Sequence, residues 1–323
     1  MIRLGFIGAG AIGSLFGGYI ANIKKRNIEV TLFCSHDHAI AIKRHGLKIK
    51  TEDKVIRLQN LNVFDRNTEN FVENLNFDYL FLTTKTYDTK QAINQYKQVI
   101  NNCRYIVILQ NGLGNEDLLL PDVSKEKIFR IVTSHGAILD LPGQVTHTGK
   151  GFTFIGIPYL NSVRRKQSLY EDIQINLNSL NILLNLAGFN SQIEMNIIIK
   201  VWEKAIVNIG INAIGALTRL NNGKIIESEG LCKLMEKTVI EAVYVGKSMN
   251  ISLSKEKCIE LTNTVANQTY NNKNSMLQDI LNGKKTEIDN LNGKIVDLAR
   301  NLKIDVYTNE ILTKLIKGLE RGL

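Results

Sequence analysis

Short apolar runs alternate with helical patterns along the first 130 residues of the chain. Residues 2–7 form one such run, which breaks into GAGAIG, and the following SLFGGYIANI has the apolar spacing of a helix. Similar runs, each typical of a strand, lie at residues 29–34, 79–84, 105–109 and 128–133. Strands that alternate with helices predict a parallel sheet with helices on both faces.

The pattern changes after this region. Residues 144–156 (QVTHTGKGFTFIG) predict an antiparallel pair of strands that closes the edge of the sheet. From about residue 168 helical periods dominate, and the remaining strand signal is a short piece near residues 189–195. We therefore expect an α/β domain at residues 1–195 and an all-helical domain at residues 196–323, packed closely together.

The segment GAGAIG contains a GxGxxG pattern between a predicted strand and a predicted helix. In this context the first glycine permits a tight turn, the second lets the backbone approach a pyrophosphate, and the third lets helix and strand pack closely. The helix N-terminus also presents N–H groups and a positive dipole to the phosphates. A glycine turn without a ligand is the alternative, but the context indicates a Rossmann-type dinucleotide site with the cofactor-binding residues Gly8, Ala9, Gly10, Ala11, Ile12 and Gly13.

The end of the second predicted strand bears on the choice of dinucleotide. NAD sites usually carry an acid there for the ribose hydroxyls, whereas NADP sites supply positive charge. This strand ends at Cys34 and is followed by Ser35, with Asp37 slightly beyond. Ser35, backed by Lys43 or Arg44, favours NADP(H) over NAD(H).

Two polar residues follow predicted strands directly. Lys85 comes after YLFLTT, and Asn111 comes after YIVILQ, with Gly112 and Gly114 beside it. Ligands of open α/β sheets lie outside the carboxyl ends of the strands. A lysine after a strand is ordinarily a solvated loop residue, but matching positions on two strands indicate a cofactor crevice.

The segment WEKAIVNIGIN at residues 202–212 combines an apolar helix with a polar stripe. Lys204, Asn208 and Asn212 recur every four residues, so they lie within roughly 80° of one another around a helix. Such a stripe faces either water or a polar ligand. The apolar surroundings favour the ligand.

Charge and cysteine content exclude several functions. The net charge is +9, but its lysines and arginines are scattered, and the tightest groups are only residues 24–26 and 164–166, so we expect no nucleic-acid partner. Four widely spaced cysteines without a CxxC pair indicate free thiols in the cytoplasm and no metal site. The basic cluster near the N-terminus follows its apolar run, so we expect neither a secretory signal nor a membrane span.

Four segments behind the glycine turn resemble the ketopantoate reductase family. They are TTK at 83–85, QNGLGN at 110–115, WEKAIVNIGIN at 202–212 and SMLQDILNGKKTEIDNLNG at 275–293. The resemblance implies a Rossmann domain joined to a helical domain of the 6-phosphogluconate dehydrogenase type. It further implies NADPH-dependent reduction of ketopantoate (2-dehydropantoate) to pantoate, a step towards pantothenate and coenzyme A.

The resemblance also implies roles for individual residues. Lys204 becomes the proton donor and Glu287 its carboxylate partner near the nicotinamide ribose, while Asn111 touches both nicotinamide and substrate. Further substrate contacts fall on Asn208, Asn212, Asn222 and Ser275, and further cofactor contacts on Ser35, Lys85 and the backbone at Ala137. Two positions depart from the family, because Ser35 stands where an arginine is usual and Tyr307 where proline is common.

The chemistry of these residue types suits a ketone reductase. Hydride transfer to a carbonyl creates alkoxide charge, which a positioned proton donor neutralises. Partial burial of a lysine disfavours its ammonium form and makes it a better acid. Simpler roles are open for Ser275, as the cap of the helix MLQDIL, and for Glu287, as a first-turn acid of a helix capped by Thr286.

Two other functions are compatible with some of these residues. A relative with the same machinery reduces another 2-keto acid or an opine-type substrate. A non-catalytic NADP(H)-binding sensor keeps the glycine turn but has no need of Lys204 and Glu287. A small 2-keto acid is the expected partner, in a cleft between the domains, and a homodimer is compatible with the sequence without being fixed by it.

Overall fold

The computed structural model describes residues 1–24, 27–65, 75–164 and 167–322. The chain divides into two compact units. The first consists of Met1–Gln110 and Asn115–Ile197, and the second of Asn111–Gly114 and Ile198–Leu323. The short loop Asn111–Gly114 therefore belongs with the second unit, although the strand that leads into it lies in the first.

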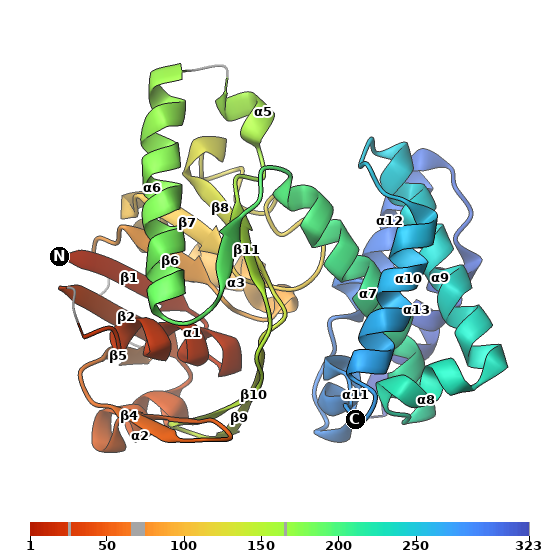
Figure 1. Cartoon of the computed structure of the whole chain (residues 1–323), viewed down its shortest axis with the longest axis horizontal. Coiled ribbons are helices and arrows are strands. Elements are labelled where there is room, and N and C mark those ends of the chain that lie inside the picture. The colour runs from red at the N-terminus through yellow and green to blue at the C-terminus, as the bar shows by residue number, and fades with distance from the viewer. Residues whose placement is uncertain (25–26, 66–74, 165–166, 323) are drawn as a thin grey trace. The chain divides into compact units, whose positions relative to one another are not determined.

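An eight-stranded sheet forms the centre of the first unit (Figure 1). Its order is β12-β11-β8-β7-β6-β1-β2-β5, and the six strands from β8 to β5 are parallel. The predicted Rossmann-type α/β class is confirmed. The strands are β1 (Ile2–Ile7), β2 (Ile28–Cys34), β5 (Asn62–Asp65), β6 (Tyr79–Leu82), β7 (Tyr105–Ile108), β8 (Ile128–Thr133), β11 (Thr153–Gly156) and β12 (Ser191–Ile193).

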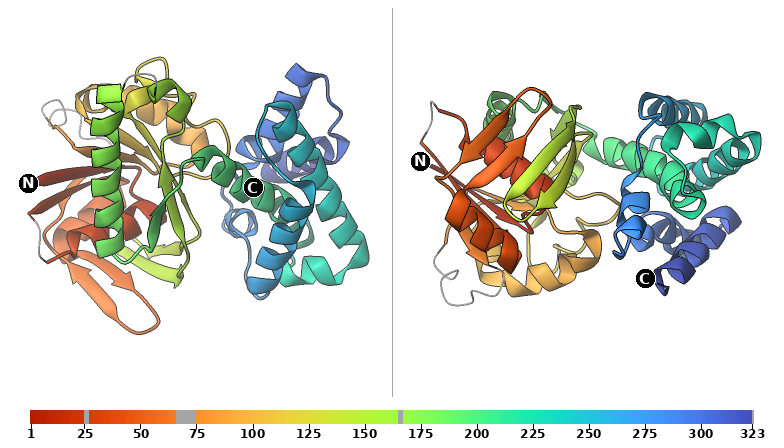
Figure 2. Two further views of the ribbon diagram at one scale, coloured as in Figure 1. Left: turned by 45° about the horizontal axis from the view of Figure 1, so that its top comes forward. Right: turned by 90° about the horizontal axis from the view of Figure 1, so that it is seen from below.

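The expectation of an antiparallel pair within residues 144–156 is wrong, because the two strands there belong to different sheets. Gly143 has a φ of 78°, which permits a tight turn, so β10 (Gln144–Gly149) folds back on β9 (Gly136–Leu141). These two join β3 (Leu47–Lys50) and β4 (Val55–Leu58) in a small sheet that packs on α1 (Figure 2). β11 instead pairs antiparallel with β8 in the large sheet.

Helices cover both faces of the large sheet because its central strands are apolar on both sides. In β1, Phe6 belongs to the core beneath α1 and α6, and the next residue, Ile7, belongs to the core beneath α3 and α4. This is the pattern of a parallel sheet that is buried on both faces. The helices of this unit are α1 (Ala11–Ala21), α2 (His36–His45), α3 (Thr89–Gln95), α4 (Lys97–Asn102), α5 (Leu160–Val163) and α6 (Gln167–Leu186), with the 3₁₀ turns η1 (Thr86–Asp88) and η2 (Lys125–Lys127).

The second unit is helical, as predicted. Its first helix, α7 (Ile197–Thr218), buries Ala205, Ile206 and Ile209. The other elements are α8 (Asn222–Glu227), α9 (Glu229–Ser248), α10 (Lys255–Gln268), α11 (Ser275–Leu281), η3 (Ile288–Asn290), α12 (Asn292–Leu302) and α13 (Tyr307–Glu320). Among the described residues, no helix has the length and hydropathy of a membrane span.

Candidate active site

The glycine turn has the geometry of a phosphate cradle. A Cβ on Gly8, which has a φ of 78°, would lie 2.3 Å from Thr84 Cγ2, and a Cβ on Gly13 would lie 2.5 Å from Thr83 Oγ1. A Cβ on Gly10 would meet no atom closer than the Gly8 carbonyl oxygen at 3.9 Å. Gly10 thus leaves open space at the N-terminus of α1, where N–H groups and the helix dipole favour an anion. These residues fit the pyrophosphate of a dinucleotide.

Side-chain hydrogen bonds hold the turn in place. Thr83 Oγ1 lies 2.9 Å from the Ile7 carbonyl and 3.0 Å from the Gly8 carbonyl. Ser14 Oγ donates to the Ala9 carbonyl at 3.1 Å and lies 2.9 Å from His38 Nε2. The turn is therefore fixed to both β6 and α2.

His38 links this turn to the small sheet. The N–H of Gly143 donates to His38 Nδ1 at 2.8 Å, which makes Nδ1 an acceptor. We therefore assign the neutral tautomer with the proton on Nε2, which donates to Ser14 Oγ. Burial agrees with this assignment, because it lowers the pKa of His38 to about 4.

The adenosine end of the predicted site lies where β2 and β5 finish. Ser35 is the N-cap residue of α2, directly after the last residue of β2. Asp65, the last residue of β5, pairs with Cys34, and its Oδ2 lies 2.5 Å from His36 Nδ1. The sequence analysis missed Asp65 because β5 was not predicted.

The ends of β6 and β7 are joined by Gln110. Its Nε2 lies 2.8 Å from the Thr84 carbonyl and 2.8 Å from Thr89 Oγ1. Lys85 follows Thr84 and precedes η1. Gln110 is a structural residue of this region that the sequence analysis missed, because a glutamine before Asn111 carries no distinct signal. Ala137 lies in β9 of the small sheet, which packs on α1.

In the second unit, Lys204 meets Asn111. Lys204 Nζ donates to Asn111 Oδ1 at 2.7 Å, although the two residues are 93 positions apart. The loop that carries Asn111 packs on the turn η3, where the N–H of Leu113 donates to the Asn290 carbonyl at 3.3 Å. Glu287 immediately precedes η3, and its carbonyl accepts from the N–H of Asn290. The fold thus brings Lys204 and Asn111 into contact and attaches their loop to the turn that follows Glu287.

The polar stripe of α7 continues past Asn212. Asn208 is partly exposed, Asn212 is buried, and Gly215 lies within roughly 20° of Lys204 around the helix. A Cβ on Gly215 would lie 2.2 Å from Asn274 Nδ2. The start of α11 therefore lies against the same stripe.

Asn274, not Ser275, caps α11. Its Oδ1 accepts from the N–H of Leu277 at 2.9 Å, and Ser275 is the exposed first residue of the helix. The two capping residues are adjacent, so the sequence pattern was wrong by one position. Asn222 lies beside Asn274, and its Nδ2 donates to Thr269 Oγ1 at 2.8 Å.

The helix that was expected to begin after Thr286 is a 3₁₀ turn. Thr286 Oγ1 accepts from the N–H of Ile288 at 3.2 Å, as a capping residue does, and it donates to Glu320 Oε1 at 2.6 Å. Leu291, with a φ of −114° and a ψ of −102°, separates η3 from α12, which is why the longer helix starts later. The buried Glu287 therefore stands at a short turn and not in the first turn of an α-helix.

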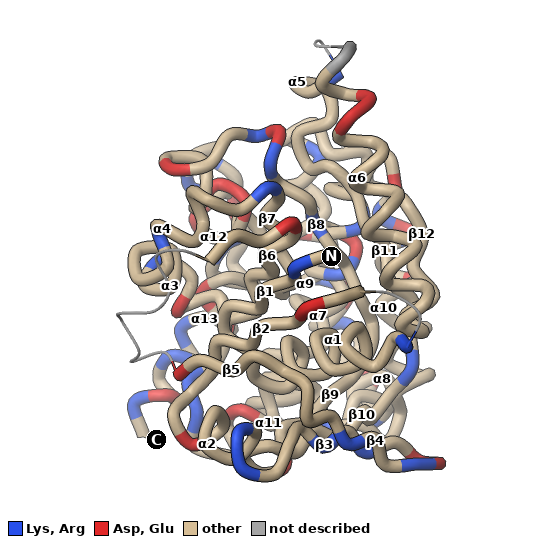
Figure 3. The backbone as a smooth tube through the Cα atoms, turned by 90° about the vertical axis from the view of Figure 1, so that its left-hand side faces the viewer, with Lys and Arg blue, Asp and Glu red and all other residues tan. Residues whose placement is uncertain are grey.

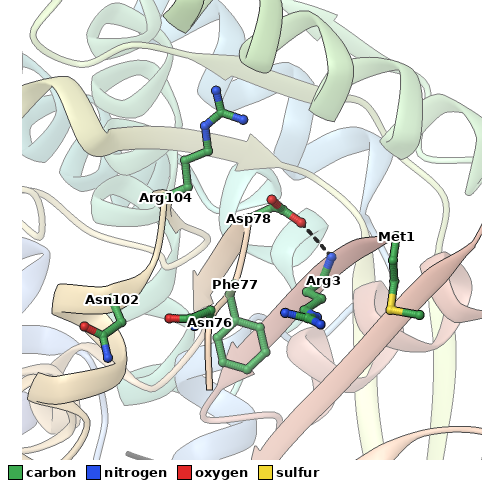
Figure 4. A pocket seen from close by; sticks show the side chains of 7 residues that line it. All are labelled: Met1, Arg3, Asn76, Phe77, Asp78, Asn102 and Arg104. Atoms are coloured by element: carbon green, nitrogen blue, oxygen red, sulfur yellow. Dashed lines mark hydrogen bonds between the residues drawn. The ribbon is translucent and has the colours of Figure 1, made fainter. Parts of the chain in front are cut away.

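A cavity of about 430 Å³ opens at the amino ends of β1, β6 and β7, opposite to the carboxyl ends where the glycine turn lies (Figure 4). Its lining includes Arg3, Asp78 and Arg104, and the N–H of Arg3 donates to Asp78 Oδ2 at 2.8 Å. Both arginines also pair with carboxylates, Arg3 with Glu29 and Arg104 with Asp172. Because ligands of α/β sheets bind at the carboxyl ends of strands, this cavity is not the candidate site.

Charges of both signs are interspersed along the elements seen in Figure 3. Of the basic groups noted in the sequence, Lys25, Arg26, Arg165 and Lys166 lie outside the described residues. The four cysteines are free. Burial raises the thiol pKa of all four, to about 12 in Cys34 and Cys103 and to about 11 in Cys258, which keeps these thiols protonated at neutral pH.

Comparisons with known proteins find relatives along nearly the whole chain. Residues 4–158 match the family model described as ketopantoate reductase PanE/ApbA, and residues 196–320 match the model of its C-terminal part. A 2-dehydropantoate 2-reductase of Pyrococcus abyssi (strain GE5 / Orsay) is 35% identical over 319 residues, covering 99% of this chain and 98% of the relative. A protein of the same name from Halobacterium salinarum (strain ATCC 700922 / JCM 11081 / NRC-1) is 30% identical, covering 97% of each.

Two solved structures share the fold. A PanE/ApbA family ketopantoate reductase from Ralstonia eutropha JMP134 superposes with a TM-score of 0.85 at 25% identity, covering 99% of each chain. A D-mandelate dehydrogenase with NADH and anilino(oxo)acetate gives a TM-score of 0.89 at 24% identity, also covering 99% of each. The chain thus belongs to the ketopantoate reductase family, and it is an oxidoreductase that reduces 2-keto acids with a nicotinamide dinucleotide.

Proposed function

We propose that this enzyme reduces 2-dehydropantoate to pantoate, in the cytoplasm and on the route to pantothenate and coenzyme A. The observation that carries the proposal is the hydrogen bond from Lys204 Nζ to Asn111 Oδ1 at 2.7 Å, on a helix whose polar stripe continues through Asn208 and Asn212. Relatives with this activity in their names match nearly the full chain, which supports the choice of substrate.

The proposed mechanism gives Lys204 the proton. A bound, reduced nicotinamide supplies the hydride to the keto carbon, and the carbonyl oxygen gains negative charge. Lys204 Nζ then protonates that oxygen, and the Asn111 amide oxygen orients the ammonium group by accepting one of its hydrogens. Asn111 is neutral at every working pH, so it positions the lysine without competing for the proton.

The remaining candidates are assigned to binding. Asn208, Asn212 and Asn222 orient the hydroxyl and carboxylate of the substrate, and Ser275 at the start of α11 meets its carboxylate. Glu287 keeps the catalytic role that the resemblance implies, as the carboxylate partner of Lys204 near the nicotinamide ribose. The dinucleotide itself is held by the glycine turn, with Ser35, Lys85 and the backbone at Ala137 as further contacts.

A neighbouring 2-keto acid is the main rival substrate. The D-mandelate dehydrogenase has the same fold at 24% identity, so the fold alone does not select ketopantoate. A non-catalytic sensor is a weaker rival, because it has no use for the hydrogen bond between Lys204 and Asn111. The homodimer remains a prediction, and Ser35 considered alone favours NADPH over NADH.

The test is a substrate panel followed at the absorbance of the reduced nicotinamide. The purified chain is given NADPH or NADH with ketopantoate, pyruvate, 2-oxoisovalerate or phenylglyoxylate, the keto acid of mandelate. We expect the highest kcat/KM with ketopantoate. Turnover of another acid without turnover of ketopantoate would refute the substrate, and no turnover of any acid would favour the sensor.

A further inference from the structure

The choice between NADH and NADPH depends on the end of the sheet where the adenosine half of a dinucleotide binds. In a Rossmann sheet this ribose lies at the carboxyl end of the second strand, which is β2 here. A carboxylate at that place accepts hydrogen bonds from ribose hydroxyls and repels the 2′-phosphate of NADPH. The inference rests on the dinucleotide role of the glycine turn and is independent of which keto acid is reduced.

β2 ends without a carboxylate of its own, but the adjacent strand supplies one. The last residue of β2 is the buried Cys34, and the chain then enters α2 at Ser35. β5 runs parallel to β2 with Asp65 paired to Cys34, so both strands end at the same level. Neighbouring strands are about 5 Å apart, which puts Asp65 one strand spacing from the usual position of the NAD-selecting acid.

Asp65 is held in a defined orientation. Its Oδ2 lies 2.5 Å from His36 Nδ1, and its side chain is 15% exposed whereas that of His36 is 61% exposed. A carboxylate has about four acceptor positions, so the contact with one ring nitrogen is compatible with a ribose hydroxyl as a further donor. The more exposed His36 limits the orientations that Asp65 can adopt.

The negative charge of Asp65 dominates over the nearby lysine at this strand end. Burial is the main cause of the raised pKa of the Cys34 thiol. The charge of Asp65 raises this pKa further, and the charge of Lys43 lowers it by a smaller amount. Lys43 and Arg44, which suggested NADP, lie in the last turn of α2, two turns away from Ser35. Among the described residues, the charges at this strand end therefore disfavour the 2′-phosphate of NADPH.

We propose that Asp65, oriented by His36, selects NADH over NADPH in this enzyme. The expectation of NADP from Ser35 rested only on residues that follow β2 in the sequence, whereas Asp65 ends the adjacent strand β5 at the same level. At the dielectric constant of water, a carboxylate about 5 Å from a doubly charged phosphate weakens the binding of that phosphate by about tenfold.

The test measures dinucleotide binding without any keto acid. Dissociation constants of NADH and NADPH are obtained by fluorescence titration of the full-length protein, and 5′-AMP and adenosine 2′,5′-bisphosphate serve as competitors. We expect the wild type to bind NADH about tenfold more tightly than NADPH. Asp65→Asn should remove most of this difference by improving the binding of NADPH.

Glu29→Gln is the matched control. It removes one negative charge from the other end of β2, where Glu29 pairs with Arg3, and should leave the ratio of the two constants unchanged. A second variant, His36→Gln, distinguishes selection by Asp65 from binding of the 2′-phosphate by His36. If His36 instead bound a 2′-phosphate, this variant would bind NADPH more weakly than the wild type, whereas selection by Asp65 predicts that NADPH binding does not weaken.

Two results would overturn the proposal. One is a wild type that binds NADPH as tightly as NADH or more tightly. This measurement tests the proposal even if Asp65→Asn fails to fold. The other is a folded Asp65→Asn protein with the wild-type ratio. Because no keto acid is present, neither result bears on whether ketopantoate is the substrate.

Discussion

Replacing Gly10 by alanine should separate dinucleotide binding from stability. A Cβ at Gly10 would have 3.9 Å of clearance, so the fold has room for it. The same methyl group would occupy the space beside the α1 N-terminus where the pyrophosphate is expected. Loss of one charge-assisted hydrogen bond there is worth about 1.5–3 kcal/mol, so Kd for the reduced dinucleotide should rise about ten- to hundredfold.

Gly13→Ala is the opposite case and serves as the comparison. Its Cβ would lie 2.5 Å from Thr83 Oγ1, which holds the Ile7 and Gly8 carbonyls, so either these bonds or the position of α1 must change. We expect a loss of about 1–3 kcal/mol in the free energy of unfolding.

Fluorescence titration and urea unfolding of both variants test the pair. If Gly10→Ala binds the dinucleotide as the wild type does, or loses as much stability as Gly13→Ala, Gly10 does not provide the space for the pyrophosphate.

The other predictions concern histidine and a helix cap. The pKa of His38 is about 4 in the folded chain, against an ordinary 6.5, so the unfolded chain takes up the proton first as the pH falls. The free energy of unfolding is therefore unaffected above pH 6.5 and decreases by about 3 kcal/mol as the pH drops towards 4. His38→Gln should reduce this pH dependence in urea unfolding. The smaller effect of His135 and His147 should remain, because burial lowers their pKa values too. If the free energy of unfolding depended on pH as strongly as in the wild type, His38 would not be neutral in the folded chain. Asn274→Ala removes the cap of α11 and should cost about 0.5–2 kcal/mol in thermal or urea unfolding, whereas Ser275→Ala should be nearly neutral in stability, and equal losses would show that the cap is misassigned.

Local patterns in the sequence were sufficient for the centre of the fold. The strands around the glycine turn carry strong apolar patterns and were predicted close to their observed bounds, whereas residues 202–212 predicted only the middle of the longer helix α7. The short strands β3, β4 and β5 have four residues each and mix charged with apolar side chains, so periodicity did not reveal them. Their absence from the prediction also hid Asp65.

Pairings between distant residues could not be predicted from local patterns. β10 and β11 are close in sequence but pair with β9 and β8 respectively, which depends on the turn at Gly143. The Lys204–Asn111 contact was not predicted, because nothing near either residue specifies the other, and the family resemblance implied Glu287 as the partner of Lys204. Asn274 differs from the predicted cap by one residue, since both types cap helices equally well.

The central claim is that Lys204 donates the proton during reduction of a 2-keto acid. The measurement is kcat for ketopantoate, with NADH and with NADPH, in Lys204→Met and in Lys200→Met, which removes a lysine one turn earlier on α7 that pairs with Glu203. We predict that Lys204→Met lowers kcat by about 10²–10⁴ while dinucleotide binding is retained, and that Lys200→Met stays near the wild type. A Lys204→Met enzyme with nearly wild-type kcat would contradict the account.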